Sequence, residues 1–116
     1  MADYEPDCLF CRIGAGEIPA EIVHSDEQVV VFRDINPRAP THVLAIPRRH
    51  IPSAAELTDA DAELLSAMFG AMRKVATDGG LQGYRIVSNV GAESGQSVFH
   101  LHFHLLGGRP MTWPPG

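Results

Sequence analysis

Residues 98–106 read Val-Phe-His-Leu-His-Phe-His-Leu-Leu, so three histidines alternate with large apolar side chains. In a β-strand, successive side chains point to opposite faces of the sheet. His100, His102 and His104 are therefore predicted to share one face, with neighbouring imidazoles roughly 6.6 Å apart along the strand. The apolar side chains between them would anchor the other face of the strand in a hydrophobic core.

This row of imidazoles indicates a chemical site, because the fold alone gives no reason to place half of the chain's 6 histidines there. Imidazole titrates near neutral pH, and it can bind a metal or act as nucleophile, acid or base. A catalytic zinc takes three protein ligands and a water molecule, and a His-x-His pair on a strand can supply two of those ligands. From this segment alone, a metal site and a nucleophilic site are equally good interpretations.

The segment from His100 to Leu106 resembles the signature of the histidine triad (HIT) family, in which three histidines alternate with apolar residues. The flanking sequence resembles the HINT branch of that family, the nucleoside phosphoramidate hydrolases. The similar segments are residues 8–13, 17–20, 32–37, 39–42, 95–100 and 106–116, and they occur in the expected order. The resemblance covers nearly the whole chain.

Length and composition are typical of a small globular enzyme. The chain has 116 residues, so we expect one domain, residues 1–116, with a real hydrophobic core. The net charge is −5 without a block of Lys or Arg, which argues against a polynucleotide partner but allows a local anion site. The sequence has no apolar run long enough for a membrane span and no signal peptide. We therefore expect a cytoplasmic protein without a membrane partner.

Local patterns predict two helices and three strands besides the histidine strand. Asp7 is expected to cap a short helix at residues 8–13, and Thr58 to cap a long helix that ends at the glycines 79–80. The apolar stripe expected on the long helix consists of Ala62, Leu65, Phe69, Met72 and Ala76. Strands are expected at residues 29–32, 42–46 and 84–88, and a polar loop at residues 89–97.

Strands around one long helix predict an α+β fold with a mainly antiparallel sheet. Periodicity leaves the order of the strands open. The family resemblance implies a HIT-like fold with five antiparallel strands, the long helix on one side and a short N-terminal helix. It also implies a two-fold homodimer, to which the residues themselves add only Trp113 in a tail of exposed character.

The resemblance implies hydrolysis of purine nucleoside 5′-phosphoramidates through a nucleotidyl-histidine intermediate, with AMP as the bound product. A neutral imidazole is nucleophilic at pH 7, and a covalent intermediate splits one difficult step into two. By this resemblance His102 is the nucleophile, and His104 orients the phosphate and helps to move protons. His42, predicted on a neighbouring strand, completes the catalytic histidine cluster together with His100.

The loop at residues 89–97 is suited to phosphate binding, because its glycines allow successive backbone N–H groups to face an anion. Its neutral polar side chains, which can donate hydrogen bonds, are Asn89, Gln96 and Ser97. The resemblance places Asn89 and Ser97 at the phosphate, with the backbone N–H of Val98 beside them. By pattern alone, this segment is an ordinary polar loop.

The resemblance also assigns the remaining nucleotide contacts. Asp34 would accept hydrogen bonds from the ribose hydroxyls, a role that suits a carboxylate. The residues that the family packs against the base are Phe10, Ile13, Ile18, Phe32, Ile35 and Leu44. By pattern alone, each of these apolar residues is a core residue, and Asp34 is an aspartate in a turn.

Cys8 and Cys11 form a Cys-x-x-Cys motif with four interpretations. A thioredoxin-like redox pair normally follows a strand in a βαβ unit, and none precedes it here. A disulfide is unusual in a cytosolic protein. Some bacterial HIT proteins use this motif for structural zinc, which implies Zn²⁺ bound by Cys8, Cys11, His50 and His100. The alternative is two reduced cysteines packed near the nucleotide pocket.

Two other functions remain open at this level. One is hydrolysis of dinucleoside polyphosphates, against which the HINT-like tail and residues 95–97 argue. The other is a non-catalytic module that binds a nucleotide or zinc. Thr112 stands where many HINT proteins have a histidine, so contacts between the tail and the substrate are in doubt. Arg33 could alter the rim of the ribose or the base site.

Overall fold

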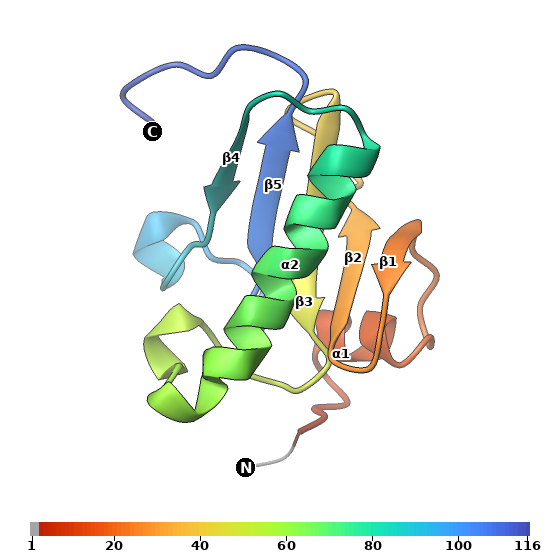
Figure 1. Cartoon of the computed structure of the whole chain (residues 1–116). Coiled ribbons are helices and arrows are strands. Elements are labelled where there is room, and N and C mark those ends of the chain that lie inside the picture. Colours follow the sequence, from red (N-terminus) through yellow and green to blue (C-terminus); the bar gives the residue numbers. More distant parts are fainter. Residues whose placement is uncertain (1–2) are drawn as a thin grey trace.

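The computed structural model describes residues 3–116. Its strands are β1 (Ile22–Ser25), β2 (Val29–Arg33), β3 (Thr41–Pro47), β4 (Tyr84–Val87) and β5 (Phe103–Gly107), and its helices are α1 (Leu9–Gly14) and α2 (Ala62–Asp78). Short 3₁₀ turns occur at Ala54–Glu56, Asp59–Asp61 and Ala92–Ser94. Within the described residues, all strand pairs are antiparallel and form one sheet in the order β1-β2-β3-β5-β4 (Figure 1). The predicted α+β fold is confirmed.

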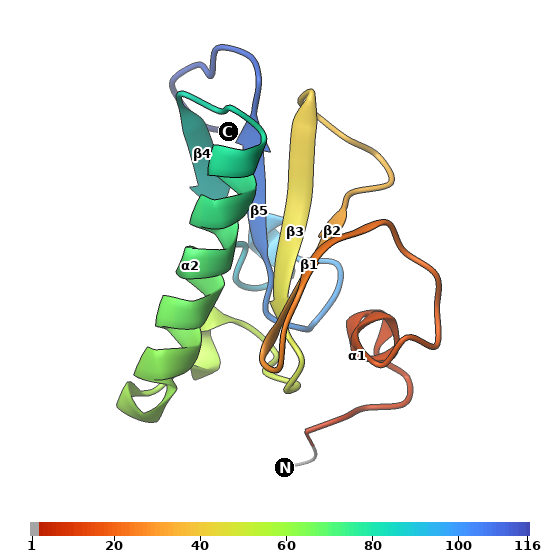
Figure 2. The ribbon, with the colours of Figure 1, turned by 45° about the vertical axis from the view of Figure 1, so that its right-hand side comes forward.

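The larger hydrophobic cluster lies between the sheet and α2. Side chains alternate between the faces of a strand, and Val31, Val43 and Leu105 turn toward the helix. There they meet Met68 and Met72, both of which are 0% exposed. Figure 2 shows α2 over this face of the sheet and α1 on the other side.

The opposite face of the sheet forms a smaller cluster with α1. Phe10 and Ile13 of the helix meet Phe32 of β2 and Leu44 of β3. The rings of Phe10 and Phe32 lie edge to face, with centroids 5.5 Å apart. His42 lies two residues before Leu44 and shares its face, as the alternation predicts. His42 therefore lies on the α1 side of the sheet.

The histidine segment differs from the prediction at its start. The chain enters the ladder only where β5 begins, and the backbone bends at His100. Leu101, Phe103 and Leu105 point into the main core as predicted. Phe99, in contrast, is 52% exposed, because the alternation does not continue through the bend. The predicted apolar face is therefore correct from Leu101 onward and wrong at Phe99.

The long helix begins later than its capping residue suggests. Thr58 and Asp61 form a reciprocal capping box around a 3₁₀ turn, and α2 follows that turn. The buried residues of α2 are Leu64, Met68, Ala71, Met72 and Ala76. The predicted stripe is therefore correct at Met72 and Ala76, whereas Ala62 and Phe69 are exposed and Leu65 is half-buried. Both stripes have helical spacing, and the way in which the helix lies on the sheet selects one of them.

The sequence patterns also miss β1. Its four residues, Ile22–Ser25, are exposed or half-buried at an edge of the sheet, so their polarity gives no clear alternation. The family resemblance had implied five strands without locating this one.

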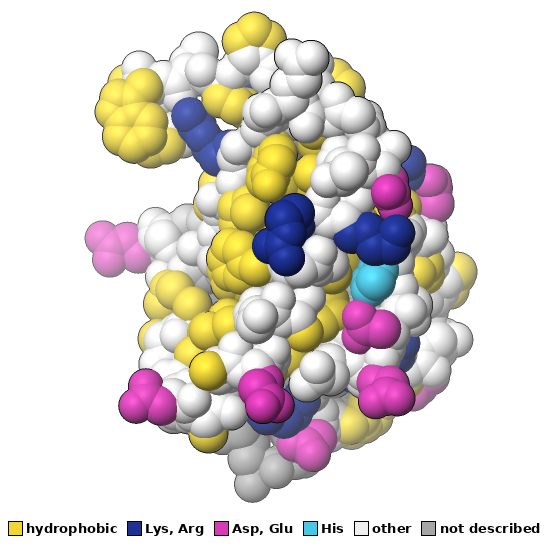
Figure 3. Space-filling view, viewed as in Figure 1, with side chains coloured by type: hydrophobic (Ala, Val, Ile, Leu, Met, Phe, Trp, Pro, Cys, Tyr) yellow, Lys and Arg dark blue, Asp and Glu magenta, His cyan; other side chains and the backbone are white. Residues whose placement is uncertain are grey.

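The face of the molecule over α2 carries side chains of mixed type (Figure 3). Lys and Arg side chains on this face are separated by acidic, apolar and neutral polar ones. Within residues 3–116, no helix combines the length and the apolar character that crossing a bilayer requires.

The burial pattern of α2 predicts where truncation destabilises the fold. Met68→Ala should lower the free energy of unfolding by about 2–4 kcal/mol, because it leaves a cavity under the helix. Met111→Ala is the matched control, because Met111 is half-buried in the C-terminal tail, and it should cost less than about 1 kcal/mol. Urea unfolding followed by circular dichroism measures both values. Equal losses would contradict the assigned core.

Candidate active site and metal cluster

Pairing of β3 with β5 brings two histidines together. Leu44 lies opposite His104 in the register, so His42 is the diagonal neighbour of His104 on the same face. Nε2 of His42 and Nδ1 of His104 are 2.9 Å apart. The backbone N–H of Arg38 donates to Nδ1 of His42 at 3.0 Å. A neutral His42 must therefore carry its proton on Nε2 and donate it to Nδ1 of His104, which leaves the proton of His104 on Nε2.

His102 has one ring nitrogen engaged and one directed elsewhere. Its Nδ1–H donates to the backbone carbonyl of His100 at 2.7 Å. The neutral ring therefore carries its lone pair on Nε2. Phe10 holds the ring from the side, with ring centroids 5.0 Å apart in an edge-to-face arrangement. His102 is thus oriented by a hydrogen bond at Nδ1 and by the contact with Phe10.

Burial keeps the paired histidines neutral. Desolvation, together with the neighbouring His102 and His42, lowers the pKa of His104 to about 4. Burial also lowers the pKa of His42, an effect that the nearby Asp34 carboxylate opposes. Neutral imidazoles at pH 7 can accept a proton or attack an electrophile, which imidazolium ions cannot do.

Asp34 lies at the edge of this histidine pair. Its Oδ1 accepts the backbone N–H of Asn36 at 2.8 Å, and its Oδ2 lies 3.6 Å from Nε2 of His42. Asp34, His42 and His104 are close enough together to suggest a metal site. However, two nitrogens on one tetrahedral zinc would be roughly 3.3 Å apart, and the 2.9 Å separation of this histidine pair is that of a hydrogen bond. The metal interpretation of the triad is therefore not favoured.

A cavity of about 390 Å³ opens beside His102 and His104. Most of the predicted nucleotide-binding residues line it, namely Phe10, Ile13, Phe32, Asp34, Ile35, Leu44, Ser97 and Val98. Ile35 stands at its rim and is 92% exposed. Arg33, expected at the rim, also lines the cavity, and so do residues that the sequence analysis did not assign to the nucleotide, namely Leu9, Pro19, Ala20 and Glu21. Pro19 and Ala20 belong to residues 17–20, which resemble the HINT branch, so the sequence could have indicated them as residues of the site.

Three predicted nucleotide contacts do not line this cavity. Ile18 packs against the α1-side cluster, and Asn89 lies half-buried just after β4. Gln96 is only 4% exposed, and its whole amide group is engaged within the protein. Its carbonyl accepts the N–H of Gly91 at 2.8 Å, and its NH₂ group donates to the carbonyls of Pro52 and Val98. Gln96 thus fixes the loop instead of offering a free hydrogen bond.

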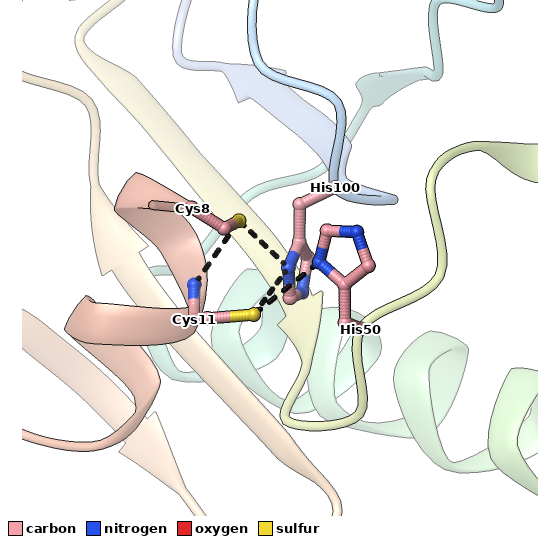
Figure 4. A group of neighbouring side chains, drawn as sticks. All are labelled: Cys8, Cys11, His50 and His100. Atoms are coloured by element: carbon pink, nitrogen blue, oxygen red, sulfur yellow. Dashed lines mark hydrogen bonds between the residues drawn. The ribbon is translucent and has the colours of Figure 1, made fainter. Parts of the chain in front are cut away.

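A second cluster lies at the other end of the histidine segment (Figure 4). The thiols of Cys8 and Cys11 lie 3.4 and 3.5 Å from Nδ1 of His100. Nδ1 of His50 lies 3.3 Å from the thiol of Cys11. All four potential ligand atoms are within 4.8 Å of one another. The predicted metal-ligating residues are therefore brought together, although they are spread over α1, the loop after β3 and the start of the histidine segment.

The local structure of α1 presents both cysteines to this cluster. Cys8, and not the predicted Asp7, is the N-cap residue of the helix, and its sulfur accepts the N–H of Cys11 at 3.4 Å. Burial raises the pKa of the Cys11 thiol to about 11. A bound cation would reverse this effect, because metal coordination stabilises the thiolate.

His100 belongs to this cluster and not to the cavity. Its side chain is 0% exposed, and its Nε2–H donates to the carbonyl of Pro47 at 2.8 Å. The neutral ring then carries its lone pair on Nδ1, the atom that faces the two thiols. Burial lowers the pKa of His100 to about 4, so the ring is neutral and suited to bind a metal. The three imidazoles predicted to share one face are therefore divided between two sites, with His100 in the cluster that the family resemblance had implied.

Comparison with known proteins places this geometry in a family. A family model described as "Scavenger mRNA decapping enzyme C-term binding" matches residues 7–113. An uncharacterized HIT-like protein of Synechocystis is 48% identical and covers 95% of this chain and 97% of its own length. The structure of a HIT family hydrolase from Legionella pneumophila is 52% identical, with a TM-score of 0.93 over 95% of this chain and all of the other. A HIT family hydrolase from Clostridium thermocellum is 45% identical, with a TM-score of 0.90 over 93% of this chain and 96% of that one.

The chain therefore belongs to the histidine triad (HIT) family, as its sequence had indicated. The naming of close structural relatives as hydrolases supports a hydrolase in general terms.

The lowered pKa of His104 predicts a pH dependence of stability. Its pKa falls from 6.5 to about 4 on folding, so the unfolded chain binds more protons between these values. The free energy of unfolding is therefore unaffected by the titration of His104 above pH 6.5, and it declines as the pH falls toward 4, because protonation favours the unfolded chain. We expect His104→Gln to flatten the decline of the unfolding free energy over this range, measured by urea titrations at several pH values. Equal slopes for the parent and His104→Gln would contradict the assignment.

Proposed function

We propose that this protein hydrolyses purine nucleoside 5′-phosphoramidates through a nucleotide covalently attached to His102. The observation that carries the proposal is the hydrogen bond from Nδ1–H of His102 to the carbonyl of His100. This bond leaves Nε2 as an unprotonated nucleophile on a residue that lines the cavity. A metal hydroxide is not required, because the imidazole itself supplies the attacking lone pair.

The reaction proceeds in two displacements at phosphorus. Nε2 of His102 forms a bond to the phosphorus atom, and the P–N bond breaks with release of the amine. His104, whose Nδ1 accepts from His42, presents its Nε2–H to the phosphoryl group and relays the proton that the amine takes up. Water then attacks phosphorus, its OH group goes to AMP and its remaining proton restores the relay. The bond to His102 breaks in this second step, and the enzyme is regenerated.

The cavity lining supports a nucleotide as the substrate. Phe10, Phe32 and Leu44 offer an apolar wall for the base, and Asp34 offers a carboxylate for the ribose hydroxyls. Ser97 and Val98 line the same cavity as His102, and the family resemblance assigns them to the phosphate. The preference for a purine base is inherited from the HINT resemblance.

The second cluster fits a structural zinc ion. Ligands at 2.0–2.3 Å from a tetrahedral zinc lie roughly 3.3–3.8 Å apart. The sulfur–nitrogen separations of 3.3, 3.4 and 3.5 Å agree with this spacing. Two cysteines and two histidines also form a closed ligand set of the structural type. When bound, zinc would cross-link α1, the loop that carries His50 and the histidine segment.

The assembly and location of the protein stay predictions. A two-fold dimer and a cytoplasmic location are expected from the family resemblance and from the sequence. Trp113, the residue that suggested a tail in contact with a partner, is 81% exposed.

Substitution of the nucleophile tests the function. His102→Ala should reduce turnover of adenosine 5′-phosphoramidate by at least about 1,000-fold, because a covalent nucleophile is lost. AMP should still bind, which calorimetry measures. The parent, quenched during turnover, should show an adenylyl adduct by intact mass.

His24→Gln serves as the histidine control and should keep turnover within about twofold. Retention of turnover by His102→Ala within about tenfold of the parent would rule out the covalent mechanism. Faster turnover of a dinucleoside polyphosphate than of the phosphoramidate would assign the protein to a different hydrolase reaction.

Metal analysis tests the second cluster. Purified protein should contain about one zinc per chain by elemental analysis, because four ligands form one closed site. Removal of zinc with a chelator should lower Tm by more than about 5 °C, because binding contributes to folding. Cys8→Ser should lack zinc and should have a lowered Tm without a chelator. Metal-free protein with the same Tm would make Cys8 and Cys11 ordinary packing residues.

A further inference from the structure

His100 connects the two clusters through different parts of one residue. Its Nδ1 faces the thiols of Cys8 and Cys11 at 3.4 and 3.5 Å. Its backbone carbonyl, 2.7 Å from Nδ1 of His102, accepts the hydrogen bond that fixes the tautomer of that ring. The residue is 0% exposed, so water does not compete for either contact.

The position of this carbonyl depends on a small number of anchors. The ring of His100 donates to the carbonyl of Pro47 at 2.8 Å. The next residue, Leu101, donates its N–H to the carbonyl of Ile51 at 2.6 Å. Both of these anchors lie at the end of β3 and in the loop after it. The thiol cluster adds an anchor from a separate element, because Cys8 and Cys11 belong to the α1 segment.

We propose that the cluster of Cys8, Cys11, His50 and His100, when it holds zinc, positions the catalytic nucleophile as well as stabilising the fold. A bound metal would hold the ring of His100 at Nδ1 and would thereby restrict the movement of the His100 backbone. The carbonyl of that backbone accepts the hydrogen bond that orients His102. Cys8, Cys11 and His50 are then positioning residues that act through His100. This inference rests on the proposed function of His102.

The chemical consequence follows from the geometry of attack. Nε2 of His102 must approach phosphorus in line with the leaving nitrogen, and a misplacement of about 1 Å can cost roughly 100-fold in rate. Without metal, the hydrogen bonds to Pro47 and Ile51 remain. Turnover should therefore be reduced and not abolished.

A purely structural role would leave a different kinetic signature. Leu9, Phe10 and Ile13 of α1 line the nucleotide cavity. Loosening of α1 would weaken contacts made equally in the ground state and the transition state, which raises KM. Misorientation of His102 affects the chemical step, which lowers kcat. Because Phe10 of α1 also packs against the ring of His102, the kinetic ratio is read together with the Nδ1–H resonance of His102, which reports directly on its bond to the His100 carbonyl.

The experiment compares zinc-loaded parent, chelated parent, Cys8→Ser and His50→Ala. These two variants remove the metal from different elements, α1 and the loop after β3. Each zinc-free form should lose about 10- to 100-fold in kcat, while KM for adenosine 5′-phosphoramidate changes less than about threefold. In ¹⁵N-edited NMR, the Nδ1–H resonance of His102 should shift or broaden in each of them. His24→Gln should match the loaded parent.

Several results would overturn the proposal. An unchanged kcat and an unchanged His102 resonance in folded, chelated parent would restrict the cluster to stability. A rise in KM alone, or an effect of Cys8→Ser that His50→Ala lacks, would assign the effect to α1 and not to the metal. Complete lack of turnover by zinc-loaded parent would contradict the proposed function instead. The NMR comparison of loaded and chelated protein would still test the positioning.

Discussion

The requirement that each buried imidazole nitrogen find a hydrogen-bond partner organises this molecule. Burying a polar group without a partner costs about 1–3 kcal/mol, so three closely spaced histidines need a dedicated framework. Within the described residues, no buried side-chain nitrogen or oxygen lacks a partner. His100 donates to the carbonyl of Pro47, His102 to that of His100, and His42 accepts from the backbone of Arg38. These bonds fix the tautomers, and the tautomers decide which nitrogen is left for chemistry.

The same framework divides one short segment into two kinds of site. The bend at His100 turns its ring toward α1, where two thiols and His50 complete a set of sulfur and nitrogen ligands. Beyond the bend, regular pairing of β5 with β3 places His104 beside His42. His102 lies between these regions and is held by the carbonyl of one neighbour while it faces the cavity. His100 of the Cys–His cluster and His102, the proposed nucleophile, are thus two residues apart in sequence, yet they face different sites.

Much of the fold could be predicted because its local patterns are strong. The apolar run at residues 29–32 and the alternation at 42–46 correspond to β2 and β3, and the glycines at 79–80 follow the end of α2. The prediction failed where local patterns were ambiguous or short. Ile22–Ser25 at the sheet edge has no clear alternation, and two helical stripes on α2 fit the same period. Gln96 illustrates another limit, because a glutamine in a polar loop has the same sequence signal whether its amide is free or engaged.

Alternation of residue types along the chain specified which side chains share a face, because the pleat of a strand imposes a period of two on every sequence. The residue types also indicated the chemistry of the site, because imidazoles, thiols and a carboxylate occur in the order expected from the family resemblance. Residue types do not specify which nitrogen of a ring is protonated or which groups meet across the sheet. Cys8 and His100 are 92 residues apart, and His42 and His104 are 62 apart. Their contacts depend on strand order and on the bend at His100, because a hydrogen bond is decided by distances that arise only when remote segments pack together.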